Sequence, residues 1–225
     1  MPGCGDGRGN SQGTDQESVL KTAAPTLLVI ACGAIARELV RIREMNHWDH
    51  VEFQCLPAEL HNRPERIPAA VLAKIAAERD RFEQIFVAYA DCGTGGLLDK
   101  ALEGTGIERI PGAHCYEFYA GNQEFARLAD EEPGSFYLTD FLVRHFERLV
   151  IKGLGLDRQP ALLPVYFGNY RRVVYLAQTE DPALQAMARR HAESLGLAYH
   201  YRPCGDGPLS LLLRPLLAQE ETCPS

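Results

Sequence analysis

The sequence predicts an α/β fold with a largely parallel sheet, helices on both faces and Rossmann-like strand-turn-helix units. Two apolar runs, 27–31 and 85–90, are too short for typical helices and rich in β-branched or aromatic residues, so we expect buried strands. A Cys-Gly turn follows each run closely, and apolar residues then recur at helical spacing. Strands that alternate with helices along a chain are typical of a parallel sheet.

The first half of the chain yields three strands and three helices. The segment 56–68 contains three prolines, which favours a structured loop over a helix. A short strand is also expected at 108–110, before the segment that carries His114 and Cys115. The other expected elements are strands at 26–31, 51–55 and 85–90 and helices at 34–46, 69–80 and 95–103.

The second half repeats this alternation. Thr139 or Asp140 is suited to cap the helix at 141–152, and Pro182 is suited to the first turn of a later helix. The expected elements are strands at 136–138, 171–177 and 199–202, helices at 141–152 and 160–168, and an apolar segment at 209–217.

The domain organisation follows from composition. Residues 1–24 are expected to be a disordered N-terminal tail, because this segment has too little apolar content to fold, and residues 218–225 are expected to be a C-terminal tail. Residues 25–217 form either one α/β domain or two lobes, at about 25–132 and 133–217.

Composition and charge exclude several classes of protein. The hydrophobic content of 46% and charged content of 24% are ordinary for a soluble globular protein. A net charge of −7 argues against a nucleic-acid partner. No apolar stretch approaches the roughly 20 residues that cross a bilayer, and the N-terminus lacks the apolar core of a signal peptide. We therefore expect a cytoplasmic protein without a membrane partner.

The seven cysteines suggest chemistry rather than disulfides. Their number is odd, no Cys-x-x-Cys occurs, and structural disulfides are rare in a reducing cytosol. Cys32 and Cys92 stand 60 residues apart in matching Cys-Gly turns, and Cys115 follows His114. Because sites in parallel α/β sheets lie at the carboxyl ends of strands, we expect these three cysteines to share one site. Cys55, by contrast, alternates with apolar residues and is expected in the core.

Three interpretations of the cysteines stay open. Three thiolates on zinc leave one coordination position open, and three on a four-iron, four-sulfur cluster (4Fe-4S) leave one iron open; either would bind a substrate. Without a metal, Cys92 is a candidate nucleophile, since a helix N-terminus lowers the pKa of a thiol. In the third interpretation the cysteines are core residues, because free cysteine is often buried.

Other residues near these turns are candidates for proton transfer or binding. His61 lies in the proline-rich loop at the same expected end of the sheet. Asp91 has an alternative role as the cap of the helix that starts near Thr94. The catalytic candidates are His61, His114, Glu117 and Asp91; the cofactor-binding candidates are Gly33, Gly93 and Gly95, whose turns expose backbone N–H groups; Tyr89 and Tyr116 are expected to line the pocket.

Five segments of the chain carry recognisable motifs. They are Ala31-Cys32-Gly33-Ala34, Leu60-His61-Asn62-Arg63-Pro64, Ala90-Asp91-Cys92-Gly93-Thr94-Gly95-Gly96, Gly112-Ala113-His114-Cys115-Tyr116-Glu117 and Thr139-Asp140-Phe141-Leu142-Val143-Arg144-His145-Phe146. Together they resemble an uncharacterised bacterial and archaeal family, domain of unknown function 1638, over about 25–215. Members of this family are often encoded near corrinoid-dependent methylamine methyltransferases and other one-carbon genes, so the resemblance implies an accessory role in that metabolism. It supplies no catalytic residue.

Three functions follow as hypotheses. The first is an enzyme that holds zinc or an iron–sulfur cluster through the three cysteines and acts on a small, anionic or thiol-bearing molecule. The second is a non-catalytic accessory protein that handles a metal or corrinoid for a methyltransferase. The third is a metal-free cysteine enzyme.

Overall fold

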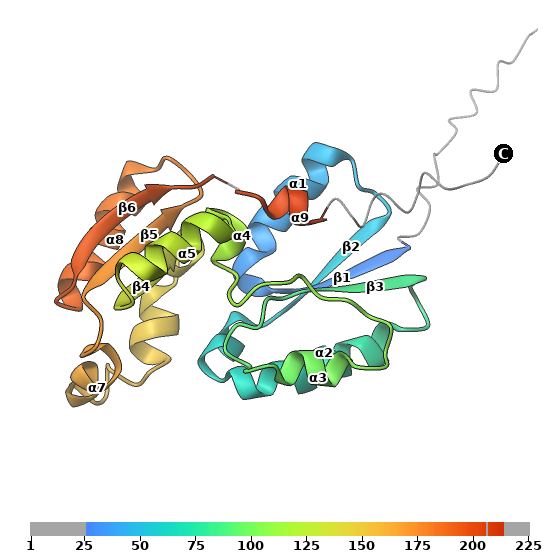
Figure 1. Ribbon diagram of the computed structural model, residues 1–225, viewed down its shortest axis with the longest axis horizontal. Helices are drawn as coiled ribbons and strands as arrows, with labels where there is room; N and C mark the ends of the chain where they lie inside the picture. Colours follow the sequence, from blue (N-terminus) through green and yellow to red (C-terminus); the bar gives the residue numbers. More distant parts are fainter. Residues whose placement is uncertain (1–25, 206, 214–225) are drawn as a thin grey trace, which may run out of the picture.

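The computed structural model describes residues 26–205 and 207–213, so the predicted tails at 1–24 and 218–225 lie outside the described residues. Within this part of the chain, the strands form two three-stranded sheets, and every strand pair is parallel (Figure 1). The predicted α/β class with parallel strands is confirmed. The arrangement in two sheets is a feature that the sequence pattern did not specify.

The first sheet has the order β2-β1-β3. Its strands are β1 (Leu27–Cys32), β2 (Val51–Leu56) and β3 (Gln84–Ala88). β1 lies in the middle and is buried along its whole length, as its continuous apolar run predicts. In the register, Ala31 lies beside Cys55 on one side and Ala88 on the other. The turns after these three strands therefore leave the sheet at the same edge.

Three helices belong to the first sheet. They are α1 (Ala36–Asn46), α2 (Ile67–Glu78) and α3 (Leu97–Leu102). α1 lies on one face of the sheet, while α2 and α3 lie side by side on the other (Figure 1). The loop between β2 and α2 forms two short 3-10 turns, Ala58–Asn62 and Pro64–Arg66, which agrees with the prediction of a structured loop.

The expected strand at 108–110 is wrong. The segment pairs with β3 through a single bridge, Val87 to Arg109, and two hydrogen bonds, Val87 N to Glu108 O and Ile110 N to Val87 O. A single bridge does not make a strand, and Pro111 follows at once, a residue that is disfavoured within strands.

The second sheet has the order β4-β5-β6. Its strands are β4 (Ser135–Thr139), β5 (Arg172–Ala177) and β6 (Ala198–Pro203), and α8 (Pro182–Ser194) connects the last two. Alternate residues of β5 belong to different cores. Val173 and Tyr175 pack in the cluster that includes α8, whereas Val174 and Leu176 pack in the cluster centred on the first sheet. One face of the second sheet thus joins the core that surrounds the first sheet, and the other face packs with α8.

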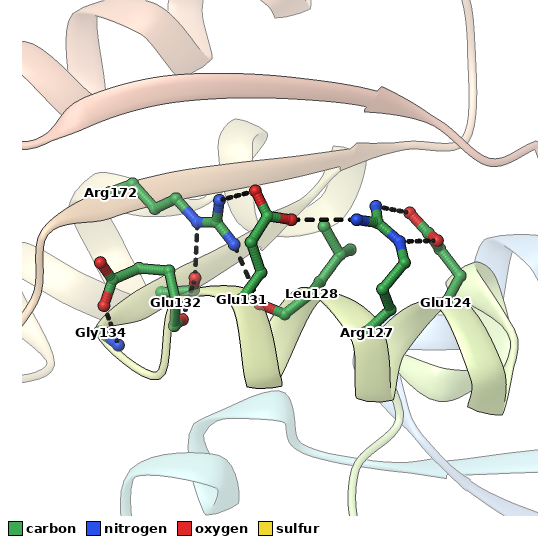
Figure 2. A network of polar contacts seen from close by, with 8 residues as sticks. Glu124, Arg127, Leu128, Glu131, Glu132, Gly134 and Arg172 are labelled. Carbon is green, nitrogen blue, oxygen red and sulfur yellow. Dashed lines mark hydrogen bonds and ion pairs between the residues drawn. The ribbon is translucent and has the colours of Figure 1, made fainter.

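A buried arginine fixes α5 (Asn122–Glu131), which follows the short α4 (Glu117–Ala120), to the second sheet. Arg172 Nε donates to Ser135 Oγ at 2.8 Å, and its Nη2 donates to the Leu128 carbonyl at 2.9 Å. Figure 2 shows how Glu131 extends this network from Arg172 to Arg127 on the surface of α5.

The helix expected at 141–152 is interrupted. α6 (Asp140–Arg144) is capped by Thr139, whose side chain accepts from Leu142 N, and a π-helix then covers Glu147–Lys152. The Leu149 carbonyl of this π-helix accepts a hydrogen bond from Asn62 Nδ2 at 2.8 Å, so the loop after β2 is tied to the second half of the chain. π-helical turns occur often at functional sites.

Two short helices complete the described chain. The helix expected at 160–168 is present as a 3-10 turn, Pro160–Leu162, followed by α7 (Leu163–Phe167). α9 (Leu209–Leu213) returns to the core of the first sheet through Leu209 and Leu213. Among the described helices, none has the length and apolar character needed to cross a membrane.

Candidate active site

A cavity of about 100 Å³ lies between the two halves of the chain and is lined mostly by apolar side chains. We call it the thiol cavity because Cys32, Cys92 and Cys115 all line it, together with His61. The structure therefore brings the three predicted cysteines together. The opposite wall comes from the second half of the chain, with Phe136, Phe141, Leu142, Leu149 and Leu154.

Cys32 is the last residue of β1. Its Sγ accepts a hydrogen bond from the backbone N–H of Ala34 at 3.5 Å, within the 3-10 turn that precedes α1. Gly33 allows a close approach to β2, since a Cβ at this position would lie 3.0 Å from the Leu56 carbonyl oxygen. Burial raises the pKa of the Cys32 thiol to about 11. Cys32 is thus a protonated thiol at neutral pH.

Cys92 occupies an unusual backbone position. Its φ of +49° is in the left-handed region, which a residue with a side chain adopts at an energetic cost. Cys92 N donates to Ala113 O at 2.9 Å, and Asp91 N donates to Gly112 O at 3.0 Å. These two bonds bind the turn that carries Cys92 to the segment that carries Cys115. Backbone strain of this kind is concentrated at functional sites.

Two of the glycines predicted to bind a cofactor, Gly93 and Gly95, are required by the backbone conformation of the turn after Cys92. Gly93 has φ of +85° and Gly95 has φ of +63°, so an L side chain would be strained at either position. These glycines allow the chain to reverse direction between Cys92 and α3.

Cys92 and Cys115 both line the thiol cavity, and each shifts the acidity of the other. A hydrogen bond from the Cys115 thiol lowers the pKa of Cys92, although burial opposes this effect. The same bond, together with burial, raises the pKa of Cys115 well above its usual value. Cys92 is therefore the first of the pair to lose its proton, and Cys115 remains the donor that stabilises the thiolate.

The two predicted histidines lie close together, but they hold different positions. His61 lines the thiol cavity, whereas His114 lies beside it and meets the His61 ring edge-on, with 5.2 Å between ring centroids. His114 also stacks on Tyr116 at 3.9 Å, and its Nδ1 lies 3.6 Å from Cys115 Sγ. Burial lowers the pKa of His61, and burial together with the neighbouring His61 lowers the pKa of His114 to about 3. Both rings are neutral at physiological pH, and the lowered pKa makes each a weaker base than a solvated imidazole.

The two predicted carboxylates hold backbone turns. Asp91 accepts hydrogen bonds from Thr94 Oγ1 at 2.5 Å, Gly96 N at 2.8 Å and Gly95 N at 3.0 Å. These partners all precede α3, whose N-cap Gly96 has no side-chain cap, so Asp91 supports the turn before the helix and the alternative role as a helix cap is wrong. Glu117 Oε1 accepts from Ala113 N at 2.8 Å and His114 N at 3.0 Å. Each carboxylate thus supports the turn that presents one of the paired cysteines.

A comparison with known families adds one finding. The family model described as "Protein of unknown function (DUF1638)" matches residues 55–213. The chain belongs to this family. The matched region of the DUF1638 protein contains His61, Cys92 and Cys115, while Cys32 precedes it. The chain matches no curated protein and no solved structure.

The other cysteines of the DUF1638 chain lie away from the cavity. Cys55 is exposed, so its expected place in the core is wrong; β2 is an edge strand, and only its two end residues, Val51 and Leu56, are buried. Cys204 is half-buried and its Sγ donates to the Arg202 carbonyl at 3.5 Å. Cys4 and Cys223 lie outside the described residues.

The positions of the cysteines can be compared with those needed for a single metal ion and for an iron–sulfur cluster. Over residues 26–205 and 207–213, no group of three or more histidine, cysteine, aspartate or glutamate side chains is arranged to hold a single metal ion. Ligands of an iron–sulfur cluster bind different irons and stand further apart, on the order of 6 to 7 Å. The expectation of a metal stays a prediction.

The tyrosine positions were predicted, whereas the opposite wall of the cavity was missed. Tyr89 and Tyr116 line the cavity as expected, and burial raises the pKa of both phenols. Leu142 and Leu149, from α6 and the π-helix, are apolar residues at helical spacing, which indicates only a buried face. The single signal for this wall was the motif at 139–146, whose residues follow the end of β4.

Proposed function

We propose that this protein is an enzyme that acts on a small molecule in the thiol cavity, with Cys92 as the reacting thiolate. The observation that carries the proposal is that Cys92 and Cys115 line the same mostly apolar cavity, where Cys115 lowers the pKa of Cys92 and the pKa of Cys115 itself is raised. A thiolate is the nucleophilic form of cysteine, and an apolar cavity of this kind is the usual setting for a small-molecule site.

The side chains around Cys92 have different roles in the proposed reaction. Cys115 donates a hydrogen bond to the Cys92 thiolate and keeps it charged in an apolar environment. His61 lines the same cavity and is a candidate acceptor for the proton that Cys92 releases, although burial lowers its pKa and so weakens it as a base. Asp91 and Glu117 hold the two turns in place, so they act on the position of the thiols rather than on the substrate. This supports nucleophilic attack by sulfur on an electrophilic carbon as the reaction class.

A second candidate function is favoured by Cys32. This third cysteine lines the same cavity, and its sulfur accepts a backbone N–H, a type of bond that tunes iron–sulfur clusters. In this alternative Cys32, Cys92 and Cys115 hold a 4Fe-4S cluster, and the iron without a cysteine ligand binds the substrate. All three cysteines would then be required to hold the cluster.

One experiment separates the two candidates. The protein is purified without oxygen, its iron and acid-labile sulfide are measured, and it is then labelled with a limiting amount of iodoacetamide and digested for mass spectrometry. A thiol enzyme should contain no stoichiometric iron or sulfide and should be alkylated first at Cys92. A cluster protein should be brown and should lose iron in each of the variants Cys32→Ser, Cys92→Ser and Cys115→Ser.

The exposed Cys55 supplies the matched control. Cys55→Ser should change neither iron content nor the labelling of Cys92, since this residue lies outside the cavity. Preferential labelling of Cys32 over Cys92 in iron-free protein would contradict the proposed role of Cys92. Full iron content in the Cys92→Ser protein would contradict the cluster.

A further inference from the structure

A second cavity, of about 380 Å³, adjoins the thiol cavity. Phe141 lines both cavities, and the turn after β1 separates them, with Gly33 on the second and Cys32 and Ala34 on the first. We call it the cationic cavity because Arg37, Arg41 and Arg144 line it. Phe141 is therefore part of a wall that the two cavities share.

The cations of this cavity come from two separate parts of the chain. Arg37 and Arg41 are one turn apart on α1, and Arg144 is the last residue of α6. Arg37 and Arg144 are exposed, and the carboxylate nearest Arg144, that of Asp181, is 3.9 Å away, the distance of a weak surface ion pair. Their guanidinium groups therefore keep donors available for a ligand.

The acids that line the same cavity do not balance these cations. The Asp140 carboxylate already accepts hydrogen bonds from Thr179 Oγ1 at 2.5 Å, Tyr175 OH at 2.6 Å and Gln178 N at 3.0 Å. Glu38 is buried, and burial raises the pKa of its carboxyl, which favours the uncharged form. Three arginines line the cavity against two carboxyl groups, so positive charge is in excess there even when both carboxyl groups are ionised, in a protein whose net charge is −7.

We infer that the cationic cavity binds the oxyanion of the substrate, a carboxylate or a phosphate, while the adjoining part of that substrate enters the thiol cavity. Guanidinium groups bind both oxyanions through paired, charge-assisted hydrogen bonds, which suits the two arginines that approach from α1 and α6. The substrate class is then a small acid or phosphate ester with an apolar, electrophilic portion. This inference rests on the proposed function for the thiol cavity, but anion binding itself does not.

The test is titration calorimetry of the full chain with two probes, inorganic phosphate and sodium propionate, at constant ionic strength. Wild-type protein should bind at least one probe at a single saturable site. Arg37→Gln combined with Arg144→Gln should weaken that binding at least about tenfold, since charge-assisted hydrogen bonds are lost. Arg190→Gln, which removes an exposed arginine from α8, should leave the affinity unchanged.

The outcomes distinguish the two ligands and the two hypotheses. Binding of phosphate alone assigns a phosphate ester, and binding of propionate alone assigns a carboxylic acid. The Cys92→Ser protein should bind the same probe with unchanged affinity, so failure of the thiol chemistry would not affect this result. The inference would be overturned if neither probe bound at a saturable site. It would also be overturned if the wild type and the double arginine variant bound the probe with equal affinity. Both arginines are exposed, so each single variant should keep the wild-type melting temperature. If the double variant does not fold, the binding measurement is made with the two single variants.

Discussion

Replacing Arg172 by methionine should destabilise the protein more than almost any other single change to a charged residue. The guanidinium is buried and makes two hydrogen bonds from a charged donor, to Ser135 Oγ and to the Leu128 carbonyl. Each such bond contributes roughly 1.5 to 3 kcal/mol, so the two contribute roughly 3 to 6 kcal/mol. The ion pair with Glu131 is left out of this sum because that carboxylate lies in solvent, where ion pairs contribute little.

Part of this loss is offset in the variant. Methionine keeps the apolar contacts of the arginine stem and removes the cost of burying a charge. We therefore expect the free energy of unfolding to fall by about 2 to 4 kcal/mol. Urea denaturation followed by circular dichroism measures this as a lower midpoint with an unchanged slope.

Arg171 supplies the control for this experiment, because it is the preceding residue and is exposed. Its Nη1 contacts the Gly168 and Tyr170 carbonyls only at 3.3 and 3.5 Å. Arg171→Met should change the free energy of unfolding by no more than about 0.5 kcal/mol. Equal effects of the two substitutions would refute the view that Arg172 fixes α5 to the second sheet.

Three further predictions follow from the site. Cys115→Ala should move the labelling of Cys92 by iodoacetamide to higher pH, because the hydrogen bond that lowers the pKa of Cys92 is removed; an unchanged pH profile would argue against the pair. The His114 imidazole has a pKa of about 3 in the folded protein, against 6.5 for a freely solvated histidine, so the unfolded chain binds the proton first and stability falls as the pH drops below about 6.5. His114→Gln should therefore show a shallower loss of unfolding free energy between about pH 6.5 and 3 than the wild type. Asn62→Ala should cost roughly 0.5 to 1.5 kcal/mol through the lost bond to the Leu149 carbonyl, whereas Arg63→Ala, one residue further on, should be neutral in the same urea titration.

The strands of the fold could be predicted because their signals are local. The apolar run of β1 and the alternation in β2 correspond to a central strand and an edge strand. The division into two sheets depends on strand order, which no local pattern encodes. The interruption after Arg144 also escaped prediction, since a π-helix at Glu147–Lys152 buries the same apolar residues as an α-helix.

The candidate site could be predicted in part for the same reason. Cys32 and Cys92 follow strands, so their common edge follows from parallel pairing. The contact between Cys92 and Cys115 depends on the bonds from Asp91 N and Cys92 N to the segment 112–113, which join residues about twenty positions apart. The cationic cavity escaped prediction because Arg37 and Arg144 look like solvated helix positions until the two halves of the chain meet.

The pH dependence of alkylation at each cysteine in one sample tests the role of Cys92 most directly. Wild-type protein, purified without oxygen and free of iron, is labelled briefly with iodoacetamide across a pH series, and the modified fraction of Cys32, Cys92 and Cys115 is measured by mass spectrometry. We expect Cys92 to react at the lowest pH, because its pKa is lowered. Cys32 should react only as the pH approaches 11, and Cys115 should stay unmodified longest. Reaction of Cys32 or Cys115 at a lower pH than Cys92 would contradict the assignment of Cys92 as the reacting thiolate.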